Sequence, residues 1–235
     1  MKTLLVDLDD TLLDYTSGIE GSWREACELI AGPCGLDTGA LGTAVIEARR
    51  WFWDDATRQV EGRRDMVAAW AAIAARGLEQ VGAVDVRMAR AIAEDYAERR
   101  RACYCLLPGA ADALAELRRR GVPMALVTNG DRREQRYKIE RFDLAKFFDV
   151  LVIEGEFGVG KPHESVYRHA LAALGAHPAT TTMVGDNLEW DVAAPQRLGI
   201  AGVWVDAPGH GLPAESPVKP DRIVRAFRDL VLLTP

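Results

Sequence analysis

Hydrophobic and polar residues follow two different patterns along the chain. Thr3–Val6 is a short, apolar, β-prone run that ends at a cluster of carboxylates, which is typical of a buried strand that stops at a polar edge. From about Asp14 to Leu107, apolar residues recur three and four positions apart in stretches rich in alanine and arginine. The spacing predicts one short strand followed by a long block of helices.

After Pro108-Gly109 the pattern changes to short strands that alternate with helices. Strands are predicted at Pro123–Val127, Val150–Ile153, Thr181–Val184 and Gly202–Val205, and helices near residues 109–120, 131–142, 164–174 and 190–198, with a last helix that carries Ile223, Phe227 and Leu230. Such alternation is typical of βαβ units, whose parallel strands are covered by helices on both faces. We therefore expect an α/β fold with a Rossmann-like, three-layer α/β/α core and a mostly parallel sheet.

The helical block interrupts the chain between the first strand and the alternating region. The simplest architecture that joins the two patterns is an α/β core of residues 1–13 and 108–235 with an inserted helical cap of residues 14–107. A chain of 235 residues is long enough for one substantial core and one smaller lobe. We expect the cap to overhang the strand ends.

Composition and charge exclude several classes of protein. Hydrophobic residues make up 49% of the chain and charged residues 27%, the balance of an ordinary folded protein. The formal net charge is −6 and the arginines are scattered, so the basic face that nucleic-acid binding requires is missing. No apolar run reaches the roughly 18 residues that span a bilayer, and no signal-peptide pattern opens the chain. We expect a cytoplasmic monomer or homodimer with a small-molecule partner, and no binding to nucleic acid or membranes.

Carboxylates follow the first predicted strand in Asp7-Leu8-Asp9-Asp10-Thr11. Because side chains alternate along a strand, Asp7 and Asp9 are expected on the same side, where two carboxylates repel each other. A cation would neutralise them, and hard oxygen ligands on a short scaffold suit Mg²⁺. Taken alone, the segment is equally well explained as an acidic turn that ends a strand.

Other predicted strands also end in polar residues. Thr128-Asn129 offers a hydroxyl and backbone N–H groups before a helix, which can receive a phosphate or only cap that helix. Lys161 lies in a glycine-flanked turn that Pro162 stops, where its ammonium can meet an anion or stay solvated.

The turn after the strand near residue 184 adds a glycine and two further acids. Gly185 permits a close approach, Asp186 sits at the carboxyl end of the strand, and Asp191 begins the following helix. In an open α/β sheet such strand ends converge, so the polar residues are expected to form one site.

The conjunction of these motifs resembles the haloacid dehalogenase superfamily, in members with a helical cap between the first and second motifs. The matching segments are Asp7-x-Asp9-x-Thr11, Thr128-Asn129, Lys161-Pro162, and Gly185-Asp186 with Asp191. The amino-acid sequence of the last motif looks closest to that of the branch that contains N-acylneuraminate-9-phosphatase and pyrimidine 5'-nucleotidases.

The resemblance implies a phosphatase that needs Mg²⁺ and acts on a small phosphorylated metabolite through an aspartyl phosphate. Asp7 would be the nucleophile and, with the Asp9 carbonyl and Asp186, a metal ligand. Asp9 would serve as acid and then as base. Thr11 would position Asp9. Phosphate would be bound by Thr128, the Asn129 backbone N–H and Lys161. Asp191, with Asn187 beside it, would support the metal or Lys161.

Several alternatives stay open. Superfamily members that cleave carbon–halogen bonds lack an acid two residues after the nucleophile, so Asp9 favours a phosphatase. Return of the phosphoryl group to an alcohol would make the chain a phosphomutase. A phospho-acceptor receiver domain also clusters Asp, Thr and Lys but has no large helical insertion, and a regulatory protein could keep the fold without activity.

Overall fold

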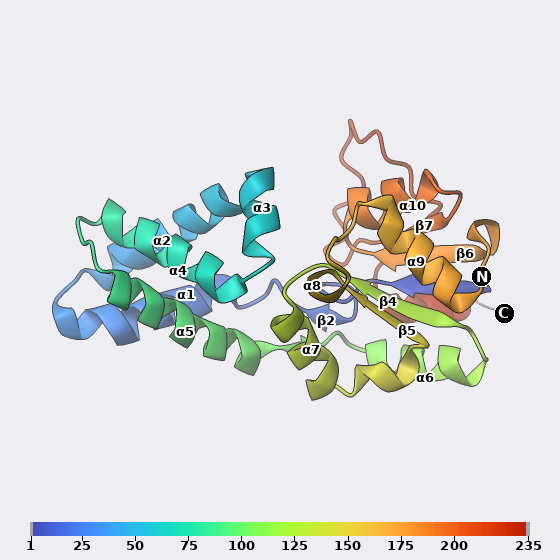
Figure 1. Ribbon diagram of the computed structural model, residues 1–235, viewed down its shortest axis with the longest axis horizontal. Helices are drawn as coiled ribbons and strands as arrows, with labels where there is room; N and C mark the ends of the chain where they lie inside the picture. Colours follow the sequence, from blue (N-terminus) through green and yellow to red (C-terminus); the bar gives the residue numbers. More distant parts are fainter. Residues whose placement is uncertain (1, 234–235) are drawn as a thin grey trace. The chain divides into compact units, whose positions relative to one another are not determined.

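The computed structural model describes residues 2–233 as two compact units (Figure 1). The α/β unit comprises the described residues up to Tyr15 and those from Cys105 on, and the helical unit comprises Thr16–Tyr104. These limits lie close to the boundaries expected at residues 13 and 108. The position of the helical unit over the strand ends, as a cap, stays a prediction.

The α/β unit is built on a single sheet in which every neighbouring pair of strands is parallel. The strands, in spatial order, are β5 (Val150–Ile153), β4 (Met124–Thr128), β1 (Thr3–Val6), β6 (Thr181–Gly185), β7 (Ala201–Val205) and β8 (Arg222–Val224). β1 lies at the centre, where Leu5 pairs with Ala125 on one side and with Met183 on the other. Its residues are all buried, because helices cover both faces of a parallel sheet.

Helices pack on the two faces of the sheet (Figure 1). One face carries α6 (Ala110–Arg119) and α7 (Arg132–Arg141), and the other carries α9 (Glu164–Leu174) and α10 (Ala194–Gln196). Val166, Tyr167 and Ala170 recur on one side of α9 and pack into a core with residues of the central strands. The predicted three-layer, Rossmann-like α/β core is thus confirmed.

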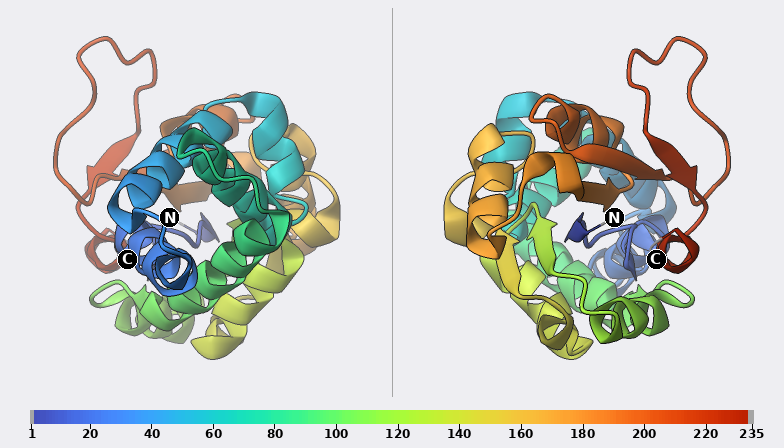
Figure 2. Two further views of the ribbon diagram at one scale, coloured as in Figure 1. Left: turned by 90° about the vertical axis from the view of Figure 1, so that its left-hand side faces the viewer. Right: turned by 90° about the vertical axis from the view of Figure 1, so that its right-hand side faces the viewer.

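The C-terminal part differs from the predicted helix that carries Ile223. Ile223 lies in β8, which pairs with β7, and its side chain is exposed. Phe227 and Leu230 are buried in a separate 3₁₀ turn, η5 (Phe227–Leu232). A strand of three residues is too short to show the alternation of apolar and polar residues, so the sequence does not distinguish it from part of a helix. The loop between β7 and β8 extends away from the sheet, as Figure 2 shows.

Two shorter features of the α/β unit also differ from the sequence prediction. The helix expected near residues 190–198 begins earlier, as a π-helical segment η4 (Leu188–Ala193) that leads into α10. A small antiparallel ribbon joins β2 (Leu13–Asp14) to β3 (Cys105–Leu106) where the chain leaves the α/β unit and returns to it. Strands of two residues show no periodicity in a sequence. The remaining short segments are α8 (Glu154–Phe157), η2 (Leu144–Phe147) and η3 (Pro178–Thr180).

The helical unit confirms the block of helices predicted from the spacing of apolar residues in the insertion. It contains α1 (Ile19–Ala31), η1 (Gly32–Cys34), α2 (Thr38–Trp53), α3 (Ala56–Gly62), α4 (Met66–Gln80) and α5 (Val86–Cys103). Aspartates cap four of these helices by accepting backbone N–H groups of the first turn, at positions 37, 55, 65 and 85. Tyr96 joins α5 to its neighbours, because its ring stacks on Trp23 at 3.7 Å and meets the edge of Trp70 at 5.2 Å.

Two glycines of the helical unit provide a test of its packing. A methyl group at Gly77 of α4 would overlap the Val45 side chain and lie 3.0 Å from the Val45 backbone, whereas one at Gly21 of α1 would meet no atom within 4 Å. We expect Gly77→Ala to lower the free energy of unfolding by about 1–3 kcal/mol through overpacking. Gly21→Ala should raise it by up to about 1 kcal/mol through helix propensity. Thermal unfolding of both variants checks this, and a stabilised Gly77→Ala protein would contradict the packing.

Candidate active site

Three adjacent strands at the centre of the sheet deliver the polar residues of the site. Asp7 directly follows β1, Thr128 ends β4 on one side of it, and Gly185-Asp186 ends β6 on the other. The Asp7 N–H donates to the carbonyl of Val184 at 3.0 Å, which keeps the two strand ends in register. Parallel strands expose their carboxyl ends at one edge, so residues far apart in the chain meet there.

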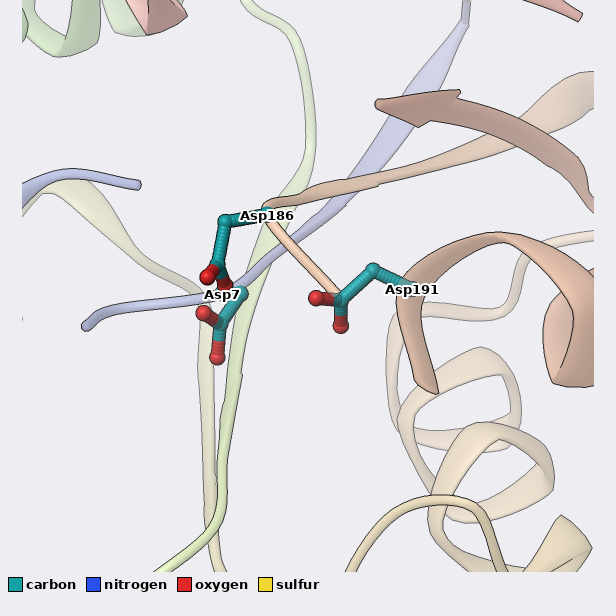
Figure 3. A group of neighbouring side chains, drawn as sticks. All are labelled: Asp7, Asp186 and Asp191. Atoms are coloured by element: carbon teal, nitrogen blue, oxygen red, sulfur yellow. The ribbon is translucent and has the colours of Figure 1, made fainter. Parts of the chain in front are cut away.

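Three carboxylates gather at this edge (Figure 3). Asp7, Asp186 and Asp191 each offer an oxygen, and these atoms all lie within 4.8 Å of one another. Asp191 is fully buried, and a side chain at Gly185 would overlap its carboxylate. The glycine before Asp186 is therefore required by the close approach of Asp191 to the strand.

Lys161 holds two of the carboxylates together. Its Nζ lies 2.7 Å from Asp7 Oδ1 and 2.6 Å from Asp191 Oδ1, and the lysine is buried. The Asn129 side chain fixes the backbone of this lysine, since it donates to the Lys161 carbonyl and accepts the Lys161 N–H, both at 2.7 Å. Asn129 thus orients Lys161 through its side chain, and the predicted use of its backbone N–H for phosphate stays a prediction.

Burial and like charge perturb the acids of the cluster. Burial raises the pKa of Asp7 to about 7, against the attraction of Lys161. Burial, followed by the charge of Asp7, raises the pKa of Asp186 to about 8. Although burial favours the neutral amine, Asp191 and Asp7 raise the pKa of Lys161 above its ordinary value. One ammonium faces three carboxylates, which leaves the cluster short of positive charge.

The donor set fits a hard divalent cation. Both oxygens of Asp191 are already bonded, one to Lys161 and the other to the Asn187 N–H at 3.0 Å. Asp7 is also bonded through both oxygens, but its bond from the Thr11 hydroxyl is long, at 3.3 Å, and a carboxylate oxygen has lone pairs left for a cation. Together with Asp186 it offers carboxylate oxygens, which are ligands that Mg²⁺ prefers. These contacts favour Asp191 as a partner of Lys161 over a role as a metal ligand.

Asn187 supports the acidic turn in a second way. Its side-chain oxygen accepts the N–H groups of Glu189 and Trp190 and so caps η4. The cap and the bond from the Asn187 N–H to Asp191 belong to the same turn. Asn187 therefore helps to set the position of Asp191, and its supporting role in the site stays a prediction.

Thr11 and Asp9 have partners that the sequence analysis did not foresee. The buried Thr11 hydroxyl donates to Asp7 Oδ2 at 3.3 Å, so in this structure it contacts the expected nucleophile instead of Asp9. The Asp9 carboxylate is bound by Lys138 of α7, whose Nζ lies 2.8 Å from each of its oxygens. Gln135 of the same helix donates to Asp9 Oδ2 at 3.1 Å and to the Thr128 hydroxyl at 2.5 Å.

Gln135 and Lys138 were missed because α7 carries almost no apolar pattern. Its ten residues include a single buried aliphatic side chain, Ile139, beside buried Gln135 and Lys138. In a sequence, such a helix looks like a solvated surface helix. The spacing of three between the two residues, which puts them on one helical face, was the available signal.

Comparison with known proteins establishes the family. A family model described as haloacid dehalogenase-like hydrolase matches residues 1–199. The chain belongs to this hydrolase family. The resemblance inferred from the four motifs is therefore confirmed, and the chain is an enzyme.

Individual relatives cover nearly the whole of this hydrolase. Phosphoserine phosphatase of Thermus thermophilus is 36% identical over 99% of this chain and 98% of its own length. N-acylneuraminate-9-phosphatase of Mus musculus is 27% identical over 99% of this chain and 93% of its own. A solved structure of the HAD-hydrolase YfnB from Bacillus subtilis, bound to magnesium, superposes with a TM-score of 0.74 at 20% identity, covering 99% of this chain and 97% of that one.

Residues 2–233 contain no helix that combines the length and the apolar character needed to cross a membrane.

The raised pKa values of Asp7 and Asp186 predict how the stability of the metal-free protein depends on pH. Both lie above the ordinary value of 3.8, so the folded state holds protons that the unfolded state has released. This stabilisation is complete below about pH 4 and is lost as the pH rises through the folded values near 7 and 8. We expect the thermal midpoint in EDTA to fall between pH 5 and 8, and Mg²⁺ to restore it most at pH 8.

Asp186→Asn provides the control for this stability profile. It removes one of the two titrating acids, so the fall in EDTA should become shallower and the effect of Mg²⁺ smaller. A midpoint that rises steadily from pH 5 to 8 in the metal-free wild-type protein would contradict the electrostatics of the cluster.

Proposed function

We propose that this hydrolase is a Mg²⁺-dependent phosphomonoesterase that acts on a small phosphorylated metabolite through an aspartyl phosphate on Asp7. The observation that carries the proposal is the buried ion pair of Asp7 with Lys161, which lies next to Asp186. A second acid, Asp9, follows Asp7 by two residues in the sequence. The names of the relatives, phosphoserine phosphatase and N-acylneuraminate-9-phosphatase, support the same class of substrate.

The first step is attack of an Asp7 carboxylate oxygen on the phosphorus atom, with departure of the alcohol oxygen. Lys161 and Thr11 each hold one oxygen of Asp7, so the carboxylate is oriented before substrate arrives. The Thr128 hydroxyl, the Asn129 backbone N–H and the Lys161 ammonium would bind phosphoryl oxygens. Positioning of this kind supplies much of the catalysis of phosphoryl transfer.

Asp9 handles the proton in both half-reactions. As an acid it protonates the departing alkoxide, and as a base it then takes a proton from the water that attacks the aspartyl phosphate. Hydrolysis returns Asp7 and releases inorganic phosphate. A carbon–halogen hydrolase of this family has no use for this second acid, so Asp9 favours phosphatase over dehalogenase chemistry.

Asp7, Asp186 and the main-chain carbonyl of Asp9 would hold Mg²⁺. When bound, the ion screens the negative charge of the nucleophile from that of the phosphoryl group. The surplus of carboxylate charge around Lys161 supports this assignment, as does the magnesium-bound structure of the relative YfnB.

The substrate belongs to the sugar phosphates, sugar-acid phosphates, nucleotides or phosphorylated amino acids. The helical unit would act as a cap that selects among them, and the protein would work in the cytoplasm as a monomer or homodimer. A screen of these esters for release of inorganic phosphate identifies the alcohol, and transfer of phosphate between two alcohols would reveal a phosphomutase instead.

Replacement of Asp9 tests the acid–base assignment. We expect Asp9→Asn to lower kcat by about two to four orders of magnitude, because the amide cannot exchange the proton. Steady-state hydrolysis of p-nitrophenyl phosphate with Mg²⁺ measures this. Asp112→Asn makes the same chemical change at an exposed position of α6 and should leave kcat unaltered. Normal turnover of Asp9→Asn would require another group to move the proton.

Removal of metal tests the role of the carboxylate cluster. We expect excess EDTA to abolish hydrolysis and added Mg²⁺ to restore it, because the uncompensated charge of Asp7 would otherwise repel the phosphoryl group. Asp186→Asn should need a higher Mg²⁺ concentration for half-maximal activity. An enzyme that keeps full activity in EDTA would refute the metal assignment.

A further inference from the structure

The contacts of Gln135 and Lys138 point to a function that the proposed mechanism does not include. Lys138 Nζ lies 2.8 Å from both oxygens of Asp9 and 2.7 Å from Gln135 Oε1. The Lys138 side chain is 3% exposed, and its ammonium lies 4.4 Å from the centre of the Tyr15 ring. A lysine enclosed in this way has lost its hydration and depends on these partners.

Gln135 connects the acid–base residue to the phosphate-binding threonine. Its amide nitrogen lies 2.5 Å from the Thr128 hydroxyl, 2.8 Å from the Asn129 carbonyl and 3.1 Å from Asp9 Oδ2. Two N–H bonds therefore serve three acceptors. If one acceptor takes a larger share of these N–H bonds, the bonds to the other two acceptors become weaker.

A polarised chain of hydrogen bonds leads from Lys138 to the phosphate site. The ammonium donates to the carbonyl oxygen of the Gln135 amide, and the same amide donates to the Thr128 oxygen. A charged donor at the start of a chain strengthens the bonds that follow it. The Thr128 hydroxyl becomes a better donor to a phosphoryl oxygen because its own oxygen already accepts a bond.

We propose that Gln135 and Lys138 are positioning residues that couple the phosphate-binding Thr128 to the acid–base Asp9. The inference rests on the proposed phosphatase function and adds two residues to it. Lys138 orients the Asp9 carboxylate toward the leaving oxygen, and Gln135 links this orientation to phosphate held by Thr128. Each residue acts on the substrate through a partner, Lys138 through the Asp9 carboxylate and Gln135 through Asp9 and Thr128.

The dependence of the rate on the leaving group separates this role from a purely structural ion pair. Phenolate is a far stronger base than p-nitrophenolate and needs the acid more, while the two phosphate esters are otherwise alike. We expect Lys138→Met to lower kcat/KM for phenyl phosphate by about 10- to 100-fold, the loss typical when an outer-shell partner of a metal-site residue is removed. The loss for p-nitrophenyl phosphate should be clearly smaller.

Arg136 offers a matched control on the same helix. It forms an ion pair with Glu156 at 2.7 Å, and its side chain is 38% exposed. Arg136→Met removes a cation of similar size and should leave the ratio of the two kcat/KM values at its wild-type level. The ratio in Lys138→Arg, which keeps the charge, should move back toward that of wild type.

Gln135→Leu tests the link to Thr128 independently and applies even if Lys138→Met does not fold. Loss of one hydrogen bond to Thr128 should weaken competitive inhibition by inorganic phosphate about tenfold. An unchanged inhibition constant in this variant, or a wild-type leaving-group ratio in folded Lys138→Met, would overturn the coupling. Absence of hydrolysis of both esters by the wild-type enzyme would instead refute the proposed function.

Discussion

The buried contact of Lys161 with Asp7 and Asp191 is the interaction on which the site depends. Three carboxylates in so small a volume would repel one another, and one buried ammonium compensates only part of their charge. The surrounding chain is shaped to maintain this contact. The Asn129 side chain forms two hydrogen bonds with the backbone of Lys161. Gly185, which has no side chain, leaves the space that the Asp191 carboxylate occupies.

The incomplete compensation is what links stability to function. A cluster that keeps a negative surplus favours protonated acids when it is empty, as the raised pKa values of Asp7 and Asp186 indicate. The same surplus favours a divalent cation, which the proposed chemistry requires. Under the proposed mechanism, the local stability lost at the sheet edge would be the physical basis for metal binding, and perturbed pKa values of this kind are common at functional sites.

Asp9 lies in a different environment although it is two residues from Asp7. Lys138 and Gln135 of α7 bind its carboxylate, whereas that of Asp7 is bound by Lys161, which lies in the turn before α9 and also contacts Asp191 of η4. Two neighbouring acids with separate cationic partners can take separate tasks in one reaction. The division of tasks that we propose for the two acids follows from these separate partners.

Local patterns in the chain were enough to predict the α/β class, the helical insertion, the central strands and the four motifs. The periods of strands and helices, and the polar residues at strand ends, can each be recognised within a short segment of sequence. Tertiary structure alone revealed β8, the ribbon of β2 and β3, and the bonding of Thr11 to Asp7. It also brought Gln135 and Lys138 to Asp9 from more than a hundred residues away. Those contacts depend on how α7 packs against the strand ends, and a polar helix carries no periodic signal of the face that it buries.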